Sequence, residues 1–235
     1  MTAASEPRAP RKRRNPKGEA RRENILDIAS EIFSEGGYHS ASIADIAARA
    51  GISQAGLLHH FPSKPELLLA VLNARDADAI RRLREGGLTG VAYLNSYLHT
   101  LKEHESDLAL VQLNAMISAE ALAETHPAHD YFVEQHRLRL DEFTRSIAET
   151  FDFDAMPTGV TAETVARWAI ALAEGMRLQV LYEEEGRANR SDTLTLFFET
   201  LRPYLKDPRP ISADQVIEVD GSRRMTVVHV EDDAG

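Results

Sequence analysis

Apolar residues recur at helical spacing along almost the whole chain. The first such stripe ends at Gly36 and Gly37, which close it as a helix C-cap would. It consists of Ile25, Ile28, Ala29, Ile32 and Phe33. Because residues three or four apart share one face of a helix, this spacing predicts a first helix from about residue 19 to the two glycines.

Two short helices follow, and each has a start and a stop signal. Ser42 precedes Asp45 by three residues, which is typical of a helix N-terminus, and Gly51 ends that helix. Ser53 can cap the next helix, and Pro62 ends it. The pattern therefore predicts helices over about 42–50 and 53–61, joined by a tight turn.

Six longer helices are expected in the remainder. Ser63 can cap the first of them, with Pro65 in its first turn. They span about 63–84, 89–104, 107–124, 128–151, 161–185 and 191–206. No alternating strand pattern appears before residue 214 and no internal repeat is found, so the predicted fold class is all-α.

The last residues have a different character. The stretch "QVIEVDGSRRMTVVHV" places two runs rich in β-branched residues around Asp220 and Gly221, which is a hairpin signal. An isolated hairpin is marginal in water, so it needs the body of the protein to pack on. A C-terminal β-hairpin and a disordered acidic tail are the two readings.

Charge is distributed unevenly along the chain, whose formal net charge is −10. Residues 1–64 carry 10 Lys and Arg against 7 Asp and Glu, whereas residues 65–235 carry 17 against 30. Residues 1–18 lack apolar periodicity and are predicted to form a flexible basic arm. A basic end on an acidic body suggests a surface that meets a polyanion, and a solvated tail is the alternative.

Composition excludes several classes of protein. The chain has no cysteine, which excludes disulfides and thiolate chemistry and fits a reducing cytoplasm. No apolar run is long enough to span a membrane, and no secretory signal is recognised. P-loop, Gly-x-Gly-x-x-Gly, Gly-x-Ser-x-Gly and Glu-x-x-His motifs are absent. We therefore expect a cytoplasmic protein that is not an enzyme, with no catalytic residues, no cofactor and no membrane partner.

The stretch "SIADIAARAGISQAGLLHHF" has the layout of a helix-turn-helix, in which the second helix enters the DNA major groove. Ala47 is small where the two helices would cross, and Gly51 permits the positive φ of the turn. Ile52 would fill the angle between the helices. Leu57 and Phe61 would face inward and hold the second helix on the body.

The remaining positions of the second helix face outward and are candidates for DNA contact. Gln54 can read adenine bidentately, and the imidazoles and Lys64 can meet phosphate oxygens. Gly56 fits either close approach of the backbone to DNA or tight packing on a neighbouring helix. The predicted DNA-binding residues are Ser42, Ser53, Gln54, Ala55, Gly56, Leu58, His59, His60 and Lys64, with Arg13, Arg14 and Arg21 from the basic N-terminal segment.

Residues 25–72, "ILDIASEIFSEGGYHSASIADIAARAGISQAGLLHHFPSKPELLLAVL", resemble the N-terminal domain of the TetR/AcrR family of transcriptional regulators. The resemblance implies a three-helix DNA-binding domain followed by a larger helical domain that dimerises and binds a small effector. It gives four regions: an arm (1–18), a helix-turn-helix domain (19–64), an effector-binding and dimerisation domain (65–206) and an acidic tail (207–235). It also implies that the last two long helices form the dimer interface, where Ala171 and Gly175 allow close approach.

One departure from the family matters. Its reading helix usually carries Thr-Leu-Tyr, with two hydroxyls that meet phosphates, where this chain has Gly56-Leu57-Leu58. More of the phosphate contact is therefore expected from His60, Lys64, Ser42 and the basic arm.

The resemblance implies a homodimeric, sequence-specific transcriptional regulator that binds a pseudo-palindromic duplex operator. We expect a repressor that a small-molecule effector releases from DNA; an activator is the alternative. The alternative is a helical enzyme or metal-binding bundle whose helix-turn-helix is structural. Salt-dependent, sequence-selective binding to duplex DNA would distinguish the two.

The segment 107–124 is apolar nearly all round and is predicted to be central. Its polar residues then need partners, which either a ligand or hydrogen bonds between helices would supply. The candidate effector-binding residues are Gln112, Asn114, Met116, Glu120, Trp168 and Arg177. An apolar helix that carries a few polar residues suggests a mostly apolar pocket, so the expected ligand is hydrophobic or moderately polar. The acidic body disfavours strong anions.

Three histidines cluster near one predicted helix start: His126, His129 and His136. A metal site is one reading, because residues three apart share a helix face. A polar helix end around Pro127 is the other, and we expect no metal.

Overall fold

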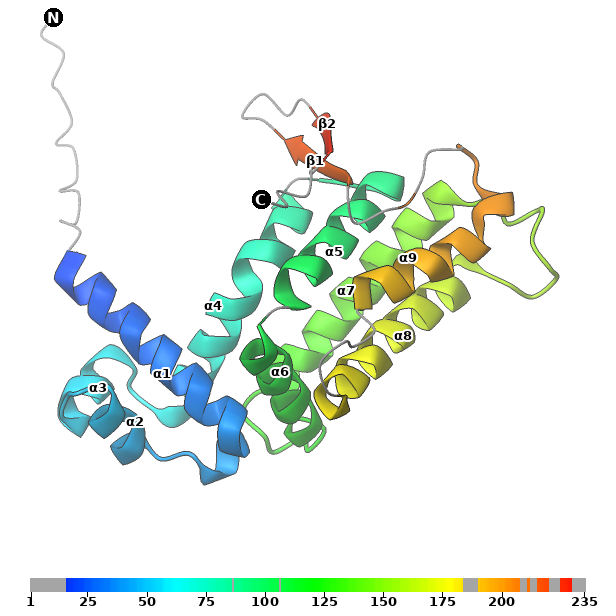
Figure 1. The fold of residues 1–235 in the computed structure, drawn as a ribbon. Helices are drawn as coiled ribbons and strands as arrows, with labels where there is room; N and C mark the ends of the chain where they lie inside the picture. Colours follow the sequence, from blue (N-terminus) through cyan, green and yellow to red (C-terminus); the bar gives the residue numbers. More distant parts are fainter. Residues whose placement is uncertain are drawn as a thin grey trace, which may run out of the picture.

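The computed structural model describes residues 16–85, 87–105, 107–183, 190–207, 211, 215–219 and 225–229. Within these residues the fold consists of nine α-helices, one 3₁₀ turn and one pair of strands (Figure 1). The helices are α1 (Pro16–Ser40), α2 (Ile43–Arg49), α3 (Gln54–His60), α4 (Lys64–Glu85), α5 (Gly90–Glu105), α6 (Leu108–Glu120), α7 (His129–Thr150), α8 (Ala162–Tyr182) and α9 (Arg190–Thr200). The all-α prediction is confirmed.

The chain ends in a two-stranded antiparallel pair, β1 (Gln215–Val219) and β2 (Met225–His229). Gln215 lies opposite His229, and Val219 lies opposite Met225. The two β-rich runs of the sequence therefore pair as the hairpin signal predicted, although Asp220 and Gly221 lie outside the described residues. Strand β1 lies against α5, so the pair is not isolated.

Several helix ends differ from the sequence prediction. Helix α1 begins at Pro16, earlier than expected, because proline is well suited to the first position of a helix. It breaks at Gly37, which has φ 75° and ψ −179°. Helix α9 stops at Thr200, and a 3₁₀ turn (Arg202–Tyr204) follows, because Pro203 cannot continue an α-helix.

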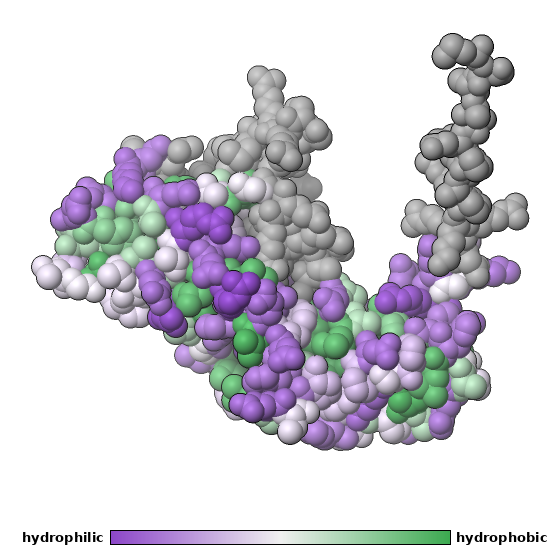
Figure 2. Space-filling view, turned by 180° about the vertical axis from the view of Figure 1, so that it is seen from behind, coloured by the Kyte–Doolittle hydropathy of each residue, from purple (hydrophilic) through white to green (hydrophobic). Residues whose placement is uncertain are grey.

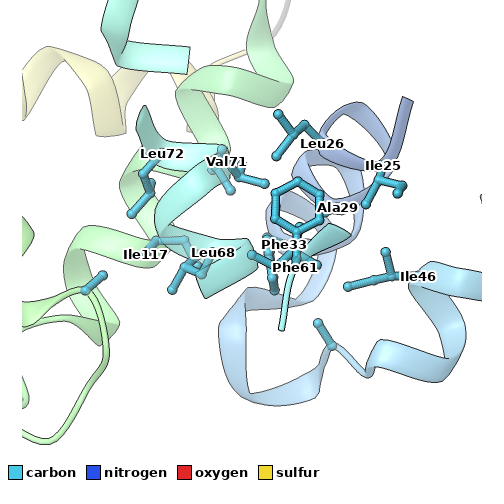
Figure 3. Close-up of a cluster of buried hydrophobic side chains, with 14 of the residues drawn as sticks. Ile25, Leu26, Ala29, Phe33, Ile46, Phe61, Leu68, Val71, Leu72 and Ile117 are labelled. Carbon is cyan, nitrogen blue, oxygen red and sulfur yellow. The ribbon is translucent and has the colours of Figure 1, made fainter. Parts of the chain in front are cut away.

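The first hydrophobic core joins the three N-terminal helices to α4 and α6 (Figure 3). Phe33 of α1 and Phe61, which caps α3, meet Leu68 of α4 and Ile117 of α6 in this core. The first turns of α4 therefore pack with α1–α3, although a domain boundary at residue 64 was expected. Helix α6 connects this end of the molecule to the rest of the body.

A second core lies among α5, α7, α8 and α9. Phe143 of α7 is fully buried there and makes edge-on contacts with Tyr93 and Tyr97 of α5. Figure 2 shows the outside of the molecule from behind, with hydrophobic patches interspersed among hydrophilic residues. Among the described helices, none has both the length and the apolar character needed to cross a membrane.

Candidate nucleic-acid interface and ligand cavity

The helix-turn-helix is built from local capping bonds. The backbone N–H of Asp45 donates to the Ser42 hydroxyl at 3.0 Å, and that of Gly56 donates to the Ser53 hydroxyl at 3.1 Å. Gly51 has φ 66°, the left-handed conformation predicted for the turn. These bonds satisfy backbone donors that the first turn of any helix leaves open.

Packing fixes which side of α3 faces outward. Leu57 is fully buried and Phe61 nearly so, as predicted, and Ala47 is buried where α2 and α3 meet. Three of the remaining α3 side chains are exposed and polar or small, namely Gln54, Ala55 and His59, while His60 is half-buried. Leu58 is 40% exposed. The structure thus presents the predicted outward positions together on one short helix.

Gly56 is not explained by a neighbouring helix. A Cβ built at Gly56 would meet only the Ser53 hydroxyl at 3.3 Å and the Ile52 Cβ at 3.9 Å, among described residues. Both atoms belong to the turn that caps the same helix. The explanation of Gly56 by tight packing on another helix is therefore wrong. The other explanation, close approach of the backbone to DNA, stays a prediction.

Two of the predicted phosphate contacts are already engaged. The Ser42 hydroxyl donates to the Asp45 carboxylate at 2.6 Å. The Lys64 ammonium lies 4.3 Å from the centroid of the Tyr38 ring and donates to the carbonyl of His39 at 3.5 Å. Burial lowers the pKa of this ammonium, an effect that the Glu120 carboxylate opposes. Lys64 would have to leave these contacts to reach DNA.

One basic residue near α3 is absent from the list of predicted DNA-binding residues. The Arg22 guanidinium of α1 lies 4.9 Å from the centroid of the Phe61 ring, which places a positive charge beside the end of α3. Arg21 is exposed on the same helix, whereas Arg13 and Arg14 lie outside the described residues. Arg49 of α2 is less available, because its guanidinium pairs with Glu31 and Glu35 at 3.2 Å.

A charged junction links the helix-turn-helix to α6. The backbone N–H of Tyr38 donates to the Glu120 carboxylate at 2.7 Å. This contact requires Gly37, because a Cβ there would lie 2.5 Å from a Glu120 oxygen. Nε2 of His126 lies 3.9 Å from the same carboxylate, and the His126 side chain is 1% exposed.

Burial lowers the pKa of the His126 imidazole, while Glu120 opposes this shift and His39 adds to it. The backbone N–H of Ala128 donates to Nδ1 of His126, so the ring is fixed on one side. Nδ1 of His129 lies 2.8 Å from the carbonyl of Ala121. In the part of the chain that the structure describes, no three His, Cys, Asp or Glu residues are arranged to hold a metal.

A cavity with a volume of about 590 Å³ lies among α5, α6, α7 and α8. Two predicted effector-binding residues line it, Asn114 of α6 and Arg177 of α8. Ser118 also lines it, four residues after Asn114 on α6. Ser118 was not among the predicted effector-binding residues.

Four predicted effector-binding residues do not line this cavity, and their role in binding an effector stays a prediction. Gln112 is exposed, because one side of α6 faces solvent and the helix is not buried all round. Met116 is half-buried outside the lining. Glu120 faces Gly37 and Tyr38 instead, and Trp168 is 48% exposed on α8.

The family model described as bacterial regulatory proteins, tetR family, matches residues 25–71. The transcriptional activator FasR of Mycolicibacterium smegmatis is 45% identical over 65 residues, which are 28% of this chain and 30% of FasR. The chain spans about a third of the length of the curated relatives that it matches first.

Solved structures resemble this chain over most of its length, including the helices after the helix-turn-helix. A TetR-family transcriptional regulator from Agrobacterium tumefaciens has a TM-score of 0.61 at 24% identity, covering 81% of this chain and all of that one. SmeT of Stenotrophomonas maltophilia, in complex with triclosan, has a TM-score of 0.65 at 22% identity, covering 83% and 97%. At these identities the likeness establishes the fold. Residues 25–71 therefore match the N-terminal domain of the TetR family, and the body of the chain has the fold of the TetR-family regulators that it resembles.

Proposed function

We propose that this chain is a sequence-specific transcriptional regulator that binds duplex DNA through α3 and is released by a small-molecule effector. The observation that carries the proposal is the exposed face of α3, held on the body by buried Leu57 and Phe61. A helix held in this way can enter a major groove with its first residues at the base edges. FasR is named an activator and SmeT a repressor, and we propose repression here.

We propose that the regulator acts as a homodimer through α8 and α9. Both helices present large apolar side chains to the outside, including Trp168 at 48%, Tyr182 at 88% and Leu196 at 67% exposure. Ala171 is exposed, and a Cβ at Gly175 would meet nothing within 4 Å in the described structure. A two-fold dimer pairs with a pseudo-palindromic operator, whose half-sites lie about 34–36 Å apart or at a multiple of that spacing.

Helix α6 offers a route from the cavity to the reading helix. It lines the cavity with Asn114 and Ser118, and its last residue, Glu120, bonds the backbone of Tyr38. A ligand that binds better to a shifted position of α6 would favour the corresponding position of the DNA-binding end. Release from DNA then follows from a change in the separation of the two reading helices.

Substituting Gln54 tests the reading role of α3. If Gln54 bonds a base edge, Gln54→Ala should weaken binding by about 1–3 kcal/mol at one operator position and relax selectivity there. Fluorescence anisotropy on single-base variants of a bound duplex measures this. Gln112→Ala is the matched control, because Gln112 is an exposed glutamine on α6, outside the helix-turn-helix. Equal weakening on every duplex would instead make Gln54 a backbone contact.

A further inference from the structure

We propose that the cavity recognises an anionic ligand, a carboxylate with an apolar tail, and that Arg177 binds the carboxylate. This inference rests on the proposed effector-binding role of the cavity. It concerns the chemical class of the ligand, which the sequence predicted to be hydrophobic or moderately polar rather than strongly anionic.

The hydrogen bonds of Arg177 leave most of its donor capacity unused. One terminal nitrogen donates to the neutral Ser118 hydroxyl at 3.3 Å, and the buried Nε has no hydrogen-bond partner in the described part of the chain. Among the described residues, no carboxylate oxygen lies within ion-pair distance of its guanidinium. A guanidinium remains charged and presents a planar fork of N–H donors that fits a carboxylate.

The environment of Arg177 raises the cost of this unpaired charge. Burial lowers the pKa of Arg177, Glu174 opposes this shift, and the positive charges of Arg139 and Arg190 add to it. Burying a charge without a counter-ion is costly, so such a group is normally paired. A bound anion would supply the missing partner.

The carboxylates in the cavity wall are already engaged elsewhere. Glu174 pairs with Arg139 at 3.3 Å, and Glu142 accepts a hydrogen bond from the Tyr93 hydroxyl at 3.2 Å. The described lining contains three arginines and these two glutamates, so its balance is positive within a chain of net charge −10. The cavity therefore differs in sign from the body that surrounds it.

The rest of the lining is suited to an apolar tail. Its apolar side chains come from several helices and include Leu101, Leu110, Val111, Phe132 and Val133. A volume of about 590 Å³ is within the range of small-ligand sites. The favoured ligand thus has one charged end and a hydrophobic remainder.

Three acid–amide pairs test the inference: decanoate with decanamide, 4-phenylbutyrate with 4-phenylbutyramide, and 2-naphthoate with 2-naphthamide. In each pair the amide has the same carbon skeleton as the acid but carries no charge. Calorimetric titration of the full chain should show at least one acid binding about tenfold or more tighter than its amide, since bonds to charged groups are the stronger ones. Arg177→Met should abolish that preference and leave amide binding within about twofold.

Two further variants make the result specific. Arg137→Met is the matched control, because Arg137 is exposed on α7, pairs with Glu134 and Asp141, and does not line the cavity. It should keep the preference for the acid. Arg177→Lys retains the charge but not the fork, and should keep only part of the preference. Unchanged melting temperatures without ligand show that each variant is folded.

Amides that bind as tightly as the acids, a preference that survives Arg177→Met, or no acid binding at millimolar concentration would overturn the inference. Adding each ligand to the protein bound to duplex DNA separates this result from the proposed function. Acid binding without any effect on DNA binding would count against regulation while the anion site stands. Release of DNA by the amides alone would support regulation and reject the anion site.

Discussion

Gly37→Ala is expected to lower the free energy of unfolding by about 3 kcal/mol. With φ 75° and ψ −179°, Gly37 occupies a backbone region that is essentially confined to glycine. The new Cβ would also lie 2.5 Å from a Glu120 oxygen. Glu120 is flexible enough to move away, but it would then lose the hydrogen bond from the Tyr38 N–H. Urea unfolding followed by circular dichroism, at one fixed protein concentration, measures the change.

Gly51→Ala is the matched control for this prediction. Gly51 also has a positive φ of 66°, but a Cβ there would meet nothing within 4 Å among described atoms. This substitution therefore tests backbone strain alone and should cost about 1 kcal/mol. If Gly37→Ala is no more destabilising than Gly51→Ala, the contact between Glu120 and Tyr38 contributes nothing measurable.

Removing residues 1–15 is expected to weaken binding to specific and random duplexes and to make the salt dependence shallower. The segment contains five bases, Arg8, Arg11, Lys12, Arg13 and Arg14. Each neutralised phosphate contributes about −0.9 to the slope of log K against log salt, so the slope should fall by about 2 for each arm if half of these bases touch DNA. A dimer would show about twice that change. The cut ends before Pro16, where α1 begins, so the fold should remain intact.

A full-length variant with glutamine at these five positions separates charge from chain length. It should match the truncated protein in salt slope and keep the base preference set by Gln54. Anisotropy titrations over a series of salt concentrations give both quantities. An identical slope in wild type and both variants would show that the arm does not contact phosphates.

The local features of this protein were predictable from sequence because their causes are local. Ser42 and Ser53 cap helices through bonds that span three residues, and Gly51 supplies one positive φ. The inward direction of Leu57 and Phe61 follows from helical spacing. These signals were sufficient to predict the helix-turn-helix and the residues of α3 that face outward.

Contacts between distant segments were not predictable in the same way. The bond between Tyr38 and Glu120 joins residues 82 positions apart, and nothing in either local pattern indicates it. Gln112 looked buried because α6 is apolar nearly all round, and only its neighbours determine which side is exposed. Arg177 was predicted as a ligand contact, but the balance of charged residues around it could be determined only from the fold.

Selection of bound duplexes from a random pool by the purified full chain tests the central claim most directly. We predict enrichment of one sequence with two inverted half-sites, since a two-fold dimer with two α3 helices would read each half alike. Gln54→Ala, carried through the same selection, should lose preference at one position in each half-site. A pool that remains random after repeated rounds, with binding that depends on salt but on no base, would contradict the account.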